Sequence, residues 1–252
     1  MSTYVLVHGA WHGAWCWKKL TPLLESAGHR VFTPTLTGLG ECADLLSPDV
    51  GLSTHIADVG ALIERERLSD VVLVGHSYGG MVITGTVDRV PDRIGHLVYL
   101  DTFVPRDGDS MQSVAPIVVG VFRIEARLHG DGWRVDPPTR EDFGVSQEPD
   151  RSWVRRSLTA QSLKSFVEPL RLTDSEIVSR FRRTHIYCAG RGHLVSLVQR
   201  TFMPRTLPPR EPGWRLRRLR AGHDCMITDP RALANLLLEA GSPTDTKAIP
   251  RR

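Results

Sequence analysis

One ten-residue stretch, Val71 to Gly80, constrains this chain more than any other. Its sequence VVLVGHSYGG begins with four apolar, mostly β-branched residues, which predict a short buried strand. The rest fits the pattern Gly-x-Ser-x-Gly, in which a serine sits on a strained turn between a strand and a helix. Gly75 and Gly79 flank this serine, where side chains would collide with a neighbouring strand or helix. We therefore predict that Ser77 is a nucleophile at the edge of a sheet.

The pattern alone occurs often by chance, and a glycine-rich turn after a strand is the alternative interpretation. The residues that follow favour a nucleophile, because residues 81–89 have the character of a helix and Val90-Pro91 would end it. The N-terminus of such a helix directs free backbone N–H groups towards the serine. The order strand, turn, helix is the context that this motif requires.

Apolar segments of strand length alternate with segments of helical periodicity along most of the chain. The expected strands are residues 3–7, 29–33, 71–74, 94–100, 184–189 and 214–219, and the expected helices are residues 15–27, 53–67, 81–89, 195–202 and 230–239. Such alternation is typical of a parallel sheet with helices on both faces. In sheets of this kind the ligand lies at the carboxyl ends of the strands, so we expect the functional site at that edge.

Residues 104–180 do not show this alternation. Prolines recur at positions 105, 116, 137, 138, 149 and 169, and aromatic residues are scattered between them. We interpret this segment as a lid inserted into a core formed by residues 1–103 and 181–240. Residues 241–252 are rich in proline, threonine and arginine, and we expect a flexible tail there. A chain of 252 residues is consistent with one α/β domain that carries such an insertion.

The charge and hydropathy exclude two classes of partner. The net charge of +4 is modest, and the arginines at positions 215, 217, 218 and 220 alternate with apolar residues as in a strand. We interpret them as a solvated face and not as a nucleic-acid site. Runs of about 18 apolar residues, which a membrane-spanning helix needs, do not occur. We therefore expect a small-molecule substrate as the partner, and the oligomeric state stays open.

The cysteines point to a reducing compartment. Cys16, Cys42, Cys188 and Cys225 stand alone, and no Cys-x-x-Cys pair is present, so we expect free thiols and no zinc site. The sequence also passes from Met1 directly into a strand, without the basic and apolar regions of a signal peptide. These features predict a cytoplasmic protein, and no ligand cluster or phosphate-binding loop suggests a metal or an organic cofactor.

A serine hydroxyl becomes a nucleophile only beside a base, and His223 is the candidate. It follows the last expected strand in a Gly-His context, which allows a loop to bring the imidazole over the serine. The alternative for any single histidine is a surface or core position, and the chain has ten. His76, which precedes the serine, is expected to pack beneath the turn.

Several segments resemble the α/β-hydrolase superfamily, and within it the plant methylesterases, the hydroxynitrile lyases and their bacterial relatives. They are VLVHGAWHGAW at residues 5–15, LLESAGH at 23–29, GHSYGGM at 75–81, and Gly222-His223-Asp224 with Met226 and Pro230. The resemblance covers both ends of the chain and is weak over residues 104–180. It implies the α/β-hydrolase fold in a short form: a six-stranded, mainly parallel sheet with helices on both faces and an inserted lid.

An oxyanion hole needs two backbone N–H groups directed at the developing negative charge. The residue after the nucleophile, Tyr78, is expected to supply one of them. The resemblance implies that Ala10, in the loop after the first strand, supplies the other. His8 and His12 belong to the same loop, and we interpret them as structural or pocket-lining residues.

The third member of a catalytic triad is where this sequence departs from the family. The methylesterases carry an aspartate just past the strand that corresponds to residues 185–188, but here the chain continues AGRGH, without a carboxylate. We predict that Asp101 replaces it, because Asp101 ends the strand after the serine turn and keeps the order Ser, Asp, His. The alternatives are that Asp101 caps a turn and that the triad is a dyad. Asp224 adjoins His223 and is badly placed to reach the far ring nitrogen.

The leading hypothesis is a serine hydrolase that cleaves carboxylic esters or thioesters through an acyl-enzyme. The aromatic and aliphatic residues of the lid suggest small to medium, partly apolar substrates. The residues expected to line the substrate pocket are His8, Trp11, Phe103, Phe122 and Trp133.

Two other functions stay open. One is non-hydrolytic chemistry on the same scaffold, such as hydroxynitrile cleavage, cyclisation or elimination. Against the cleavage, this chain has Asp224 where the lyases carry a lysine after the catalytic histidine, and Gly9 where they carry a threonine. The other is a ligand-binding protein that has lost turnover, which Ser77 and His223 argue against.

Overall fold

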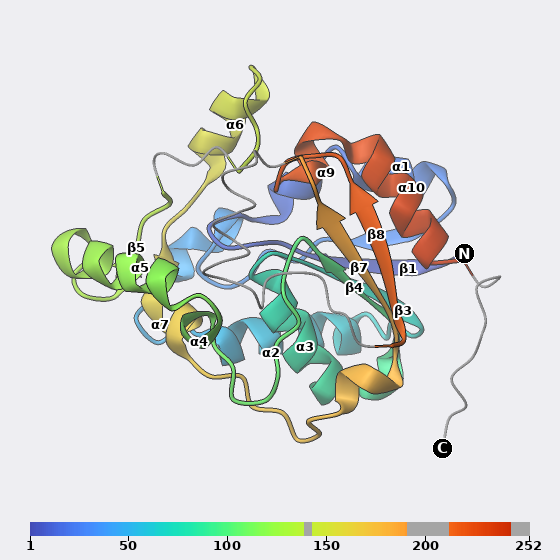
Figure 1. Ribbon diagram of the computed structural model, residues 1–252, viewed down its shortest axis with the longest axis horizontal. Coiled ribbons are helices and arrows are strands. Elements are labelled where there is room, and N and C mark those ends of the chain that lie inside the picture. The colour runs from blue at the N-terminus through green and yellow to red at the C-terminus, as the bar shows by residue number, and fades with distance from the viewer. Residues whose placement is uncertain (139–142, 191–211, 243–252) are drawn as a thin grey trace.

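The computed structural model describes residues 1–138, 143–190 and 212–242 of the chain (Figure 1). Its centre is a six-stranded sheet in the order β2-β1-β3-β4-β7-β8, and every neighbouring pair is parallel. The strands are β1 (Thr3–Val7), β2 (Arg30–Phe32), β3 (Val71–His76), β4 (Ile94–Leu100), β7 (Arg182–Cys188) and β8 (Trp214–Leu219). The predicted six-stranded α/β-hydrolase sheet is confirmed.

Two hydrophobic layers enclose the sheet, one on each face. Strand residues contribute to them alternately, because successive side chains of a strand point to opposite faces. For example, Leu73 packs in one layer and Val74 in the other. Helices α2 (Leu52–Arg65) and α3 (Gly79–Arg89) cover the first face, and α1 (Thr21–Ser26), α9 (Cys225–Thr228) and α10 (Pro230–Ala240) cover the second (Figure 1).

The register of the sheet brings the ends of its central strands to one level. Gly75 of β3 pairs with Val7 of β1 and with Tyr99 of β4, and Leu100 of β4 pairs with Ile186 of β7. The residues that follow these strands therefore meet at one edge, as expected for a parallel sheet.

Some expected elements differ from the observed ones. The helix expected over residues 15–27 is broken into a 3-10 helix (Ala14–Trp17) and α1, because Pro22 lies in the first turn of α1 and is favourable only there. Short 3-10 helices also occupy Gly40–Leu45, Pro91–Arg93 and Ile177–Arg180. The helix expected at residues 195–202 and most of the expected tail, residues 243–252, lie outside the described residues.

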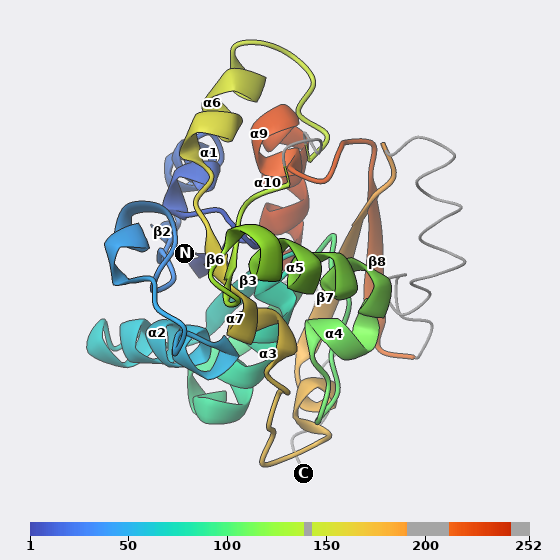
Figure 2. The ribbon, with the colours of Figure 1, turned by 90° about the vertical axis from the view of Figure 1, so that its left-hand side faces the viewer.

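The inserted segment is more regular than the sequence interpretation suggested. It contains α4 (Met111–Val114), α5 (Pro116–His129), β5 (Arg134–Val135), α6 (Asp150–Ser157), β6 (Gln161–Ser162) and α7 (Leu163–Val167). Strands β5 and β6 form a small antiparallel sheet of their own. Figure 2 shows α5 with α4 and α7 beside it, grouped at one side of the main sheet. In Figure 1 the strands β7 and β8 point towards the side on which α5 and α6 lie.

The beginning of the chain lies against the last described helix (Figure 1). The Ser2 hydroxyl donates to the carbonyl of Gly241 at 3.1 Å, and the Tyr4 hydroxyl donates to the carbonyl of Leu237 at 2.9 Å. Among the described helices, none has both the length and the apolar character to cross a membrane.

Candidate active site

Ser77 lies on the turn between β3 and α3 in the left-handed region of backbone conformation, with φ 53°. Its N–H donates to the carbonyl of Leu100 on the neighbouring strand at 3.1 Å. The flanking glycines are required by space: a Cβ on Gly75 would lie 2.5 Å from the carbonyl oxygen of Gly79, and a Cβ on Gly79 would lie 2.7 Å from that of Val7. The turn therefore has the form that the sequence predicts.

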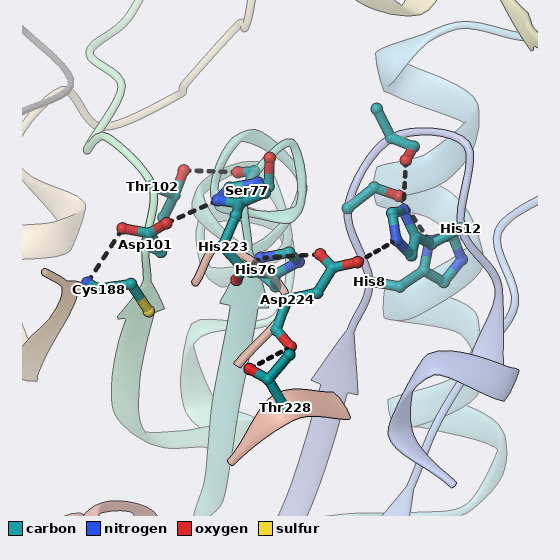
Figure 3. A network of polar contacts seen from close by, with 12 residues as sticks. His8, His12, His76, Ser77, Asp101, Thr102, Cys188, His223, Asp224 and Thr228 are labelled. Atoms are coloured by element: carbon teal, nitrogen blue, oxygen red, sulfur yellow. Dashed lines mark hydrogen bonds and ion pairs between the residues drawn. The ribbon is translucent and has the colours of Figure 1, made fainter. Parts of the chain in front are cut away.

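Asp101 follows β4 immediately and also has a positive φ, 46°. Its N–H donates to Ile186 of β7 at 2.8 Å, and its Oδ1 accepts the N–H of Cys188 at 3.1 Å. The other carboxylate oxygen, Oδ2, lies 2.6 Å from Nδ1 of His223. The carboxylate is thus held by the backbone of one strand and directed at the imidazole (Figure 3). The structure brings together the two residues that were predicted as acid and base.

His223 lies beside the serine turn because His76 holds its loop. The Nε2 of His76 is 3.0 Å from the carbonyl oxygen of His223, and the two ring centroids are 4.5 Å apart. Burial, and next the neighbouring His223, lower the pKa of His76 to about 3. The ring is therefore neutral at physiological pH and donates one hydrogen bond. This agrees with the expectation that His76 packs beneath the turn.

The loop after β1 packs directly against Ser77. A Cβ on Gly9 would lie 3.1 Å from the Cβ of Ser77, so the backbone approaches the serine closely. The Trp11 N–H is occupied, since it donates to Oε1 of Gln161 at 2.9 Å. Within the described part of the chain, neither Ala10 nor Tyr78 uses its backbone N–H in a hydrogen bond. These are the two donors that were predicted for the oxyanion hole.

His8 is a structural residue. Its Nδ1 donates to the carbonyl of Gly9 at 2.8 Å, and its Nε2 accepts the N–H of Leu36 at 3.1 Å. The side chain is fully buried, and burial lowers its pKa to about 3. Of the two roles considered for His8, the structure thus shows the structural one.

Behind the serine turn lies a second histidine–aspartate pair, which the sequence analysis missed. Nε2 of His12 is 3.0 Å from Oδ2 of Asp224, and both side chains are buried. Burial opposes the charge on both groups, but each charge favours the other: Asp224 raises the pKa of His12, and His12 lowers the pKa of Asp224. The pair is therefore ionised. No signal in the sequence connects two residues that are 212 positions apart.

An aromatic cluster forms where the lid meets the loop after β1. The ring centroid of Trp11 is 5.2 Å from that of Phe122, 5.5 Å from Phe166 and 6.2 Å from Phe143. Of the residues expected to line the pocket, Trp11 and Phe122 therefore come together. Phe143 and Phe166 also belong to this cluster. The sequence indicated this only in that both are among the scattered aromatic residues of the lid.

The other two residues expected in the pocket lie outside this cluster. Phe103 is buried in the main core, and its carbonyl oxygen would be 3.0 Å from a Cβ on Gly80 in α3. Trp133 lies between α5 and β5, where its carbonyl accepts the N–H of Leu163 at 2.7 Å.

Three side chains at the site could be considered as metal ligands. His76, His223 and Asp224 each place a potential ligand atom within 4.8 Å of the others. However, Nδ1 of His223 is bonded to Asp101, and Nε2 of His76 is bonded to a carbonyl. Hydrogen bonds thus already occupy a nitrogen of each ring, and we assign no metal to this group.

Comparisons with known proteins support the same fold. The carbendazim hydrolyzing esterase of Nocardioides sp. (strain SG-4G) is 41% identical over 250 residues, which cover 96% of this chain and all of that protein. Methylesterase 2 of Arabidopsis thaliana is 39% identical over 113 residues, 40% of each chain. Among solved structures, an extracellular alpha/beta-hydrolase from Paenibacillus has a TM-score of 0.80 and 24% identity, over 96% of this chain and 99% of that one.

The match to a family extends over almost the whole described core. The model of the alpha/beta hydrolase family matches residues 4–236, which include the serine turn, Asp101 and His223. This confirms the resemblance that the sequence motifs indicated. The chain belongs to the alpha/beta hydrolase family.

Proposed function

We propose that this protein is a serine hydrolase that cleaves carboxylic esters, or thioesters, through an acyl-enzyme. The observation that carries the proposal is the 2.6 Å contact between Oδ2 of Asp101 and Nδ1 of His223, next to the strained turn of Ser77. A carboxylate at this nitrogen orients the imidazole and stabilises the imidazolium that forms during the reaction.

In the proposed mechanism, His223 takes the hydroxyl proton of Ser77 while the serine oxygen attacks the acyl carbon. The N–H groups of Ala10 and Tyr78 stabilise the negative charge on the former carbonyl oxygen. The bond to the leaving group then breaks, and His223 returns the proton to the departing alkoxide or thiolate. Water, deprotonated by the same histidine, hydrolyses the acyl-enzyme and restores the serine.

The aromatic cluster around Trp11 suggests the kind of substrate. The ring centroids of three phenylalanines from the lid lie within 6.2 Å of that of Trp11 in the loop after β1. Two of these phenylalanines also contact each other. Such an apolar cluster, in which Trp11 and Phe166 are buried, favours small to medium substrates with an apolar or aromatic part. The names of the relatives, a carbendazim hydrolyzing esterase and a methylesterase, make carbendazim and methyl esters suitable substrates for a first test.

The test compares wild type with Ser77→Ala and Asp101→Asn on p-nitrophenyl acetate, p-nitrophenyl butyrate and carbendazim. We expect kcat to fall by about 10⁴-fold in both variants, because each removes one member of the triad. Asp174→Asn is the matched control, since Asp174 forms a surface ion pair with Arg180, and it should retain wild-type kcat. Circular dichroism verifies that all variants are folded.

Different results would contradict different parts of the proposal. Full activity of Asp101→Asn would show that the acid is assigned wrongly while the hydrolase stands. An inert wild type whose Ser77 does not react with a fluorophosphonate probe would contradict the nucleophile. In that case, release of cyanide from mandelonitrile distinguishes a lyase from a ligand-binding protein.

A further inference from the structure

Two consecutive peptide units of the loop after β1 are held by histidine side chains. The carbonyl of Gly9 accepts Nδ1–H of His8 at 2.8 Å, and the carbonyl of Ala10 accepts Nδ1–H of His12 at 2.6 Å. The second unit is also held at its other end, where the Trp11 N–H donates to Gln161. Both peptides are trans, so each N–H points away from its carbonyl. The Ala10 N–H shares a peptide with the Gly9 carbonyl, so the bond from His8 sets its direction. The bond from His12 holds the next peptide, on the other side of the Ala10 Cα, and so fixes where Ala10 lies in the loop.

The second ring nitrogen of His12 connects this loop to another segment. Nε2 of His12 lies 3.0 Å from Oδ2 of Asp224. Because a carbonyl and a carboxylate only accept hydrogen bonds, the ring must carry protons on both nitrogens. The indole of Trp15 stacks on this imidazolium at a centroid distance of 5.1 Å and an angle of 19°. The ring is thus fixed in its plane as well as at both nitrogens.

Asp224 belongs to the loop that carries His223. Its own N–H donates to the carbonyl of Phe143 in the lid at 2.8 Å, and its Oδ1 lies 4.0 Å from Nε2 of His76. Figure 3 shows Asp224 between His76 and His12. The pair therefore joins the loop of the predicted oxyanion hole to the loop of the predicted base.

We propose that His12 and Asp224 are positioning residues for the hydrolytic reaction: their buried ion pair, through the Ala10 carbonyl, holds Ala10 and the His223 loop in register around Ser77. This inference rests on the proposed function. Neither residue takes part in bond formation. Their effect is geometric, because a displacement of a donor by about 1 Å can cost about 10²-fold in rate.

A purely structural role is the alternative, and kinetics separate the two. Replacing a residue that only stabilises the fold changes the amount of folded enzyme and leaves kcat per folded molecule intact. Replacing a residue that positions an oxyanion donor lowers kcat with little change in KM, since the donor acts mainly in the transition state. Such a replacement also weakens the binding of a trifluoromethyl ketone by a similar factor, because the adduct of the ketone with Ser77 carries an oxyanion.

The experiment uses the full chain with His12→Gln, Asp224→Asn and the double variant. We expect each single variant to lower kcat for p-nitrophenyl butyrate by roughly 10- to 100-fold, with KM within about threefold and a matching rise in the inhibition constant of the ketone. The double variant should be no slower than the slower single variant, because the residues act as a unit. It contains no unpaired buried charge, so it provides the comparison if a single variant folds poorly.

His96→Gln is the matched control, a buried histidine in β4 whose Nε2 bonds to Thr184 of β7 at 2.9 Å. It should lower the urea midpoint and retain kcat. The inference is refuted if Asp224→Asn remains folded with kcat within about twofold of wild type, or if the losses in kcat add up in the double variant. An inactive wild type would refute the proposed function itself, so the two failures are distinguishable.

Discussion

Three residues at the candidate site adopt a backbone conformation with positive φ, which residues other than glycine rarely take. Trp11, Ser77 and Asp101 have φ values of 62°, 53° and 46°. Each follows a strand end or lies in the loop after β1, and each such residue costs on the order of 1 kcal/mol or more. At residue scale, three of the seven described non-glycine residues with positive φ thus lie where the predicted chemistry occurs, and the surrounding hydrogen bonds keep them in that conformation.

This strain can be measured at Ser77. Ser77→Gly should raise the free energy of unfolding by about 1 kcal/mol relative to Ser77→Ala, because only glycine adopts a positive φ without steric cost. Both variants lack the hydroxyl and should be inactive, so urea denaturation of the pair isolates the backbone effect. Equal stabilities would show that the turn is relaxed.

At the scale of elements, close approach of backbones around the serine turn decides which glycines are replaceable. We expect Gly75→Ala to lower the free energy of unfolding by about 1–3 kcal/mol, because its Cβ would meet the Gly79 carbonyl. Gly120 in α5 is the matched comparison, since a Cβ there has no neighbour within 4 Å. Gly120→Ala should raise stability by about 0.5–1 kcal/mol through helix propensity. Thermal and urea unfolding measure both, and a reversed order would contradict the packing described here.

The elements of the core could be predicted because each has one buried side or a fully buried run. Helix α5 could not, because it is apolar on two sides: Val119 and Ala126 are buried, while Ile117 and Ile124 are more than half exposed. Its apolar residues therefore do not follow a single helical face in the sequence. Pro116, in the first turn, is the one residue that indicates where this helix begins. The helix expected over residues 15–27 is there but begins later as α1, because Pro22 is favourable only in the first turn.

The candidate site could be predicted where position along a strand decides it. Ser77, Asp101 and His223 each follow a strand, so a parallel sheet brings them to one edge. The pairing of His12 with Asp224 depends instead on packing between segments that are distant in sequence. The grouping of Phe143 and Phe166 with Trp11 depends on the path of the lid, which no local pattern encodes.

At the scale of the whole molecule, buried neutral histidines make stability depend on pH. The pKa values of His8 and His76 are lowered to about 3, by burial first in both cases. In the unfolded chain these rings bind protons near pH 6.5, so between these values the unfolded state carries more protons. The contribution of these two rings to the free energy of unfolding is therefore fully present above pH 6.5. It decreases with acidification, by up to about 1.4 kcal/mol per pH unit for each ring. His12 acts in the opposite sense, since its pKa is raised.

Urea denaturation between pH 7 and pH 5 tests this dependence. His8→Gln should reduce the slope of the free energy of unfolding against pH by up to about 1.4 kcal/mol per unit, the full value being reached below about pH 6, because one titrating ring is lost. Ser26→Ala, which changes an exposed position without a titrating group, provides the control and should leave the slope as in wild type. An unchanged slope in His8→Gln would contradict the assignment of His8 as a buried neutral base.

The hydrogen bond between Ser2 and Gly241 has a consequence for engineering. It places the first and last elements of the described core side by side, so a short linker between Gly241 and Ser2 could close the described core into a ring. New termini could then be opened at the exposed Asp131 and Gly132 in the lid. In such a circular permutant the catalytic core would be one uninterrupted segment, with one part of the lid at each end.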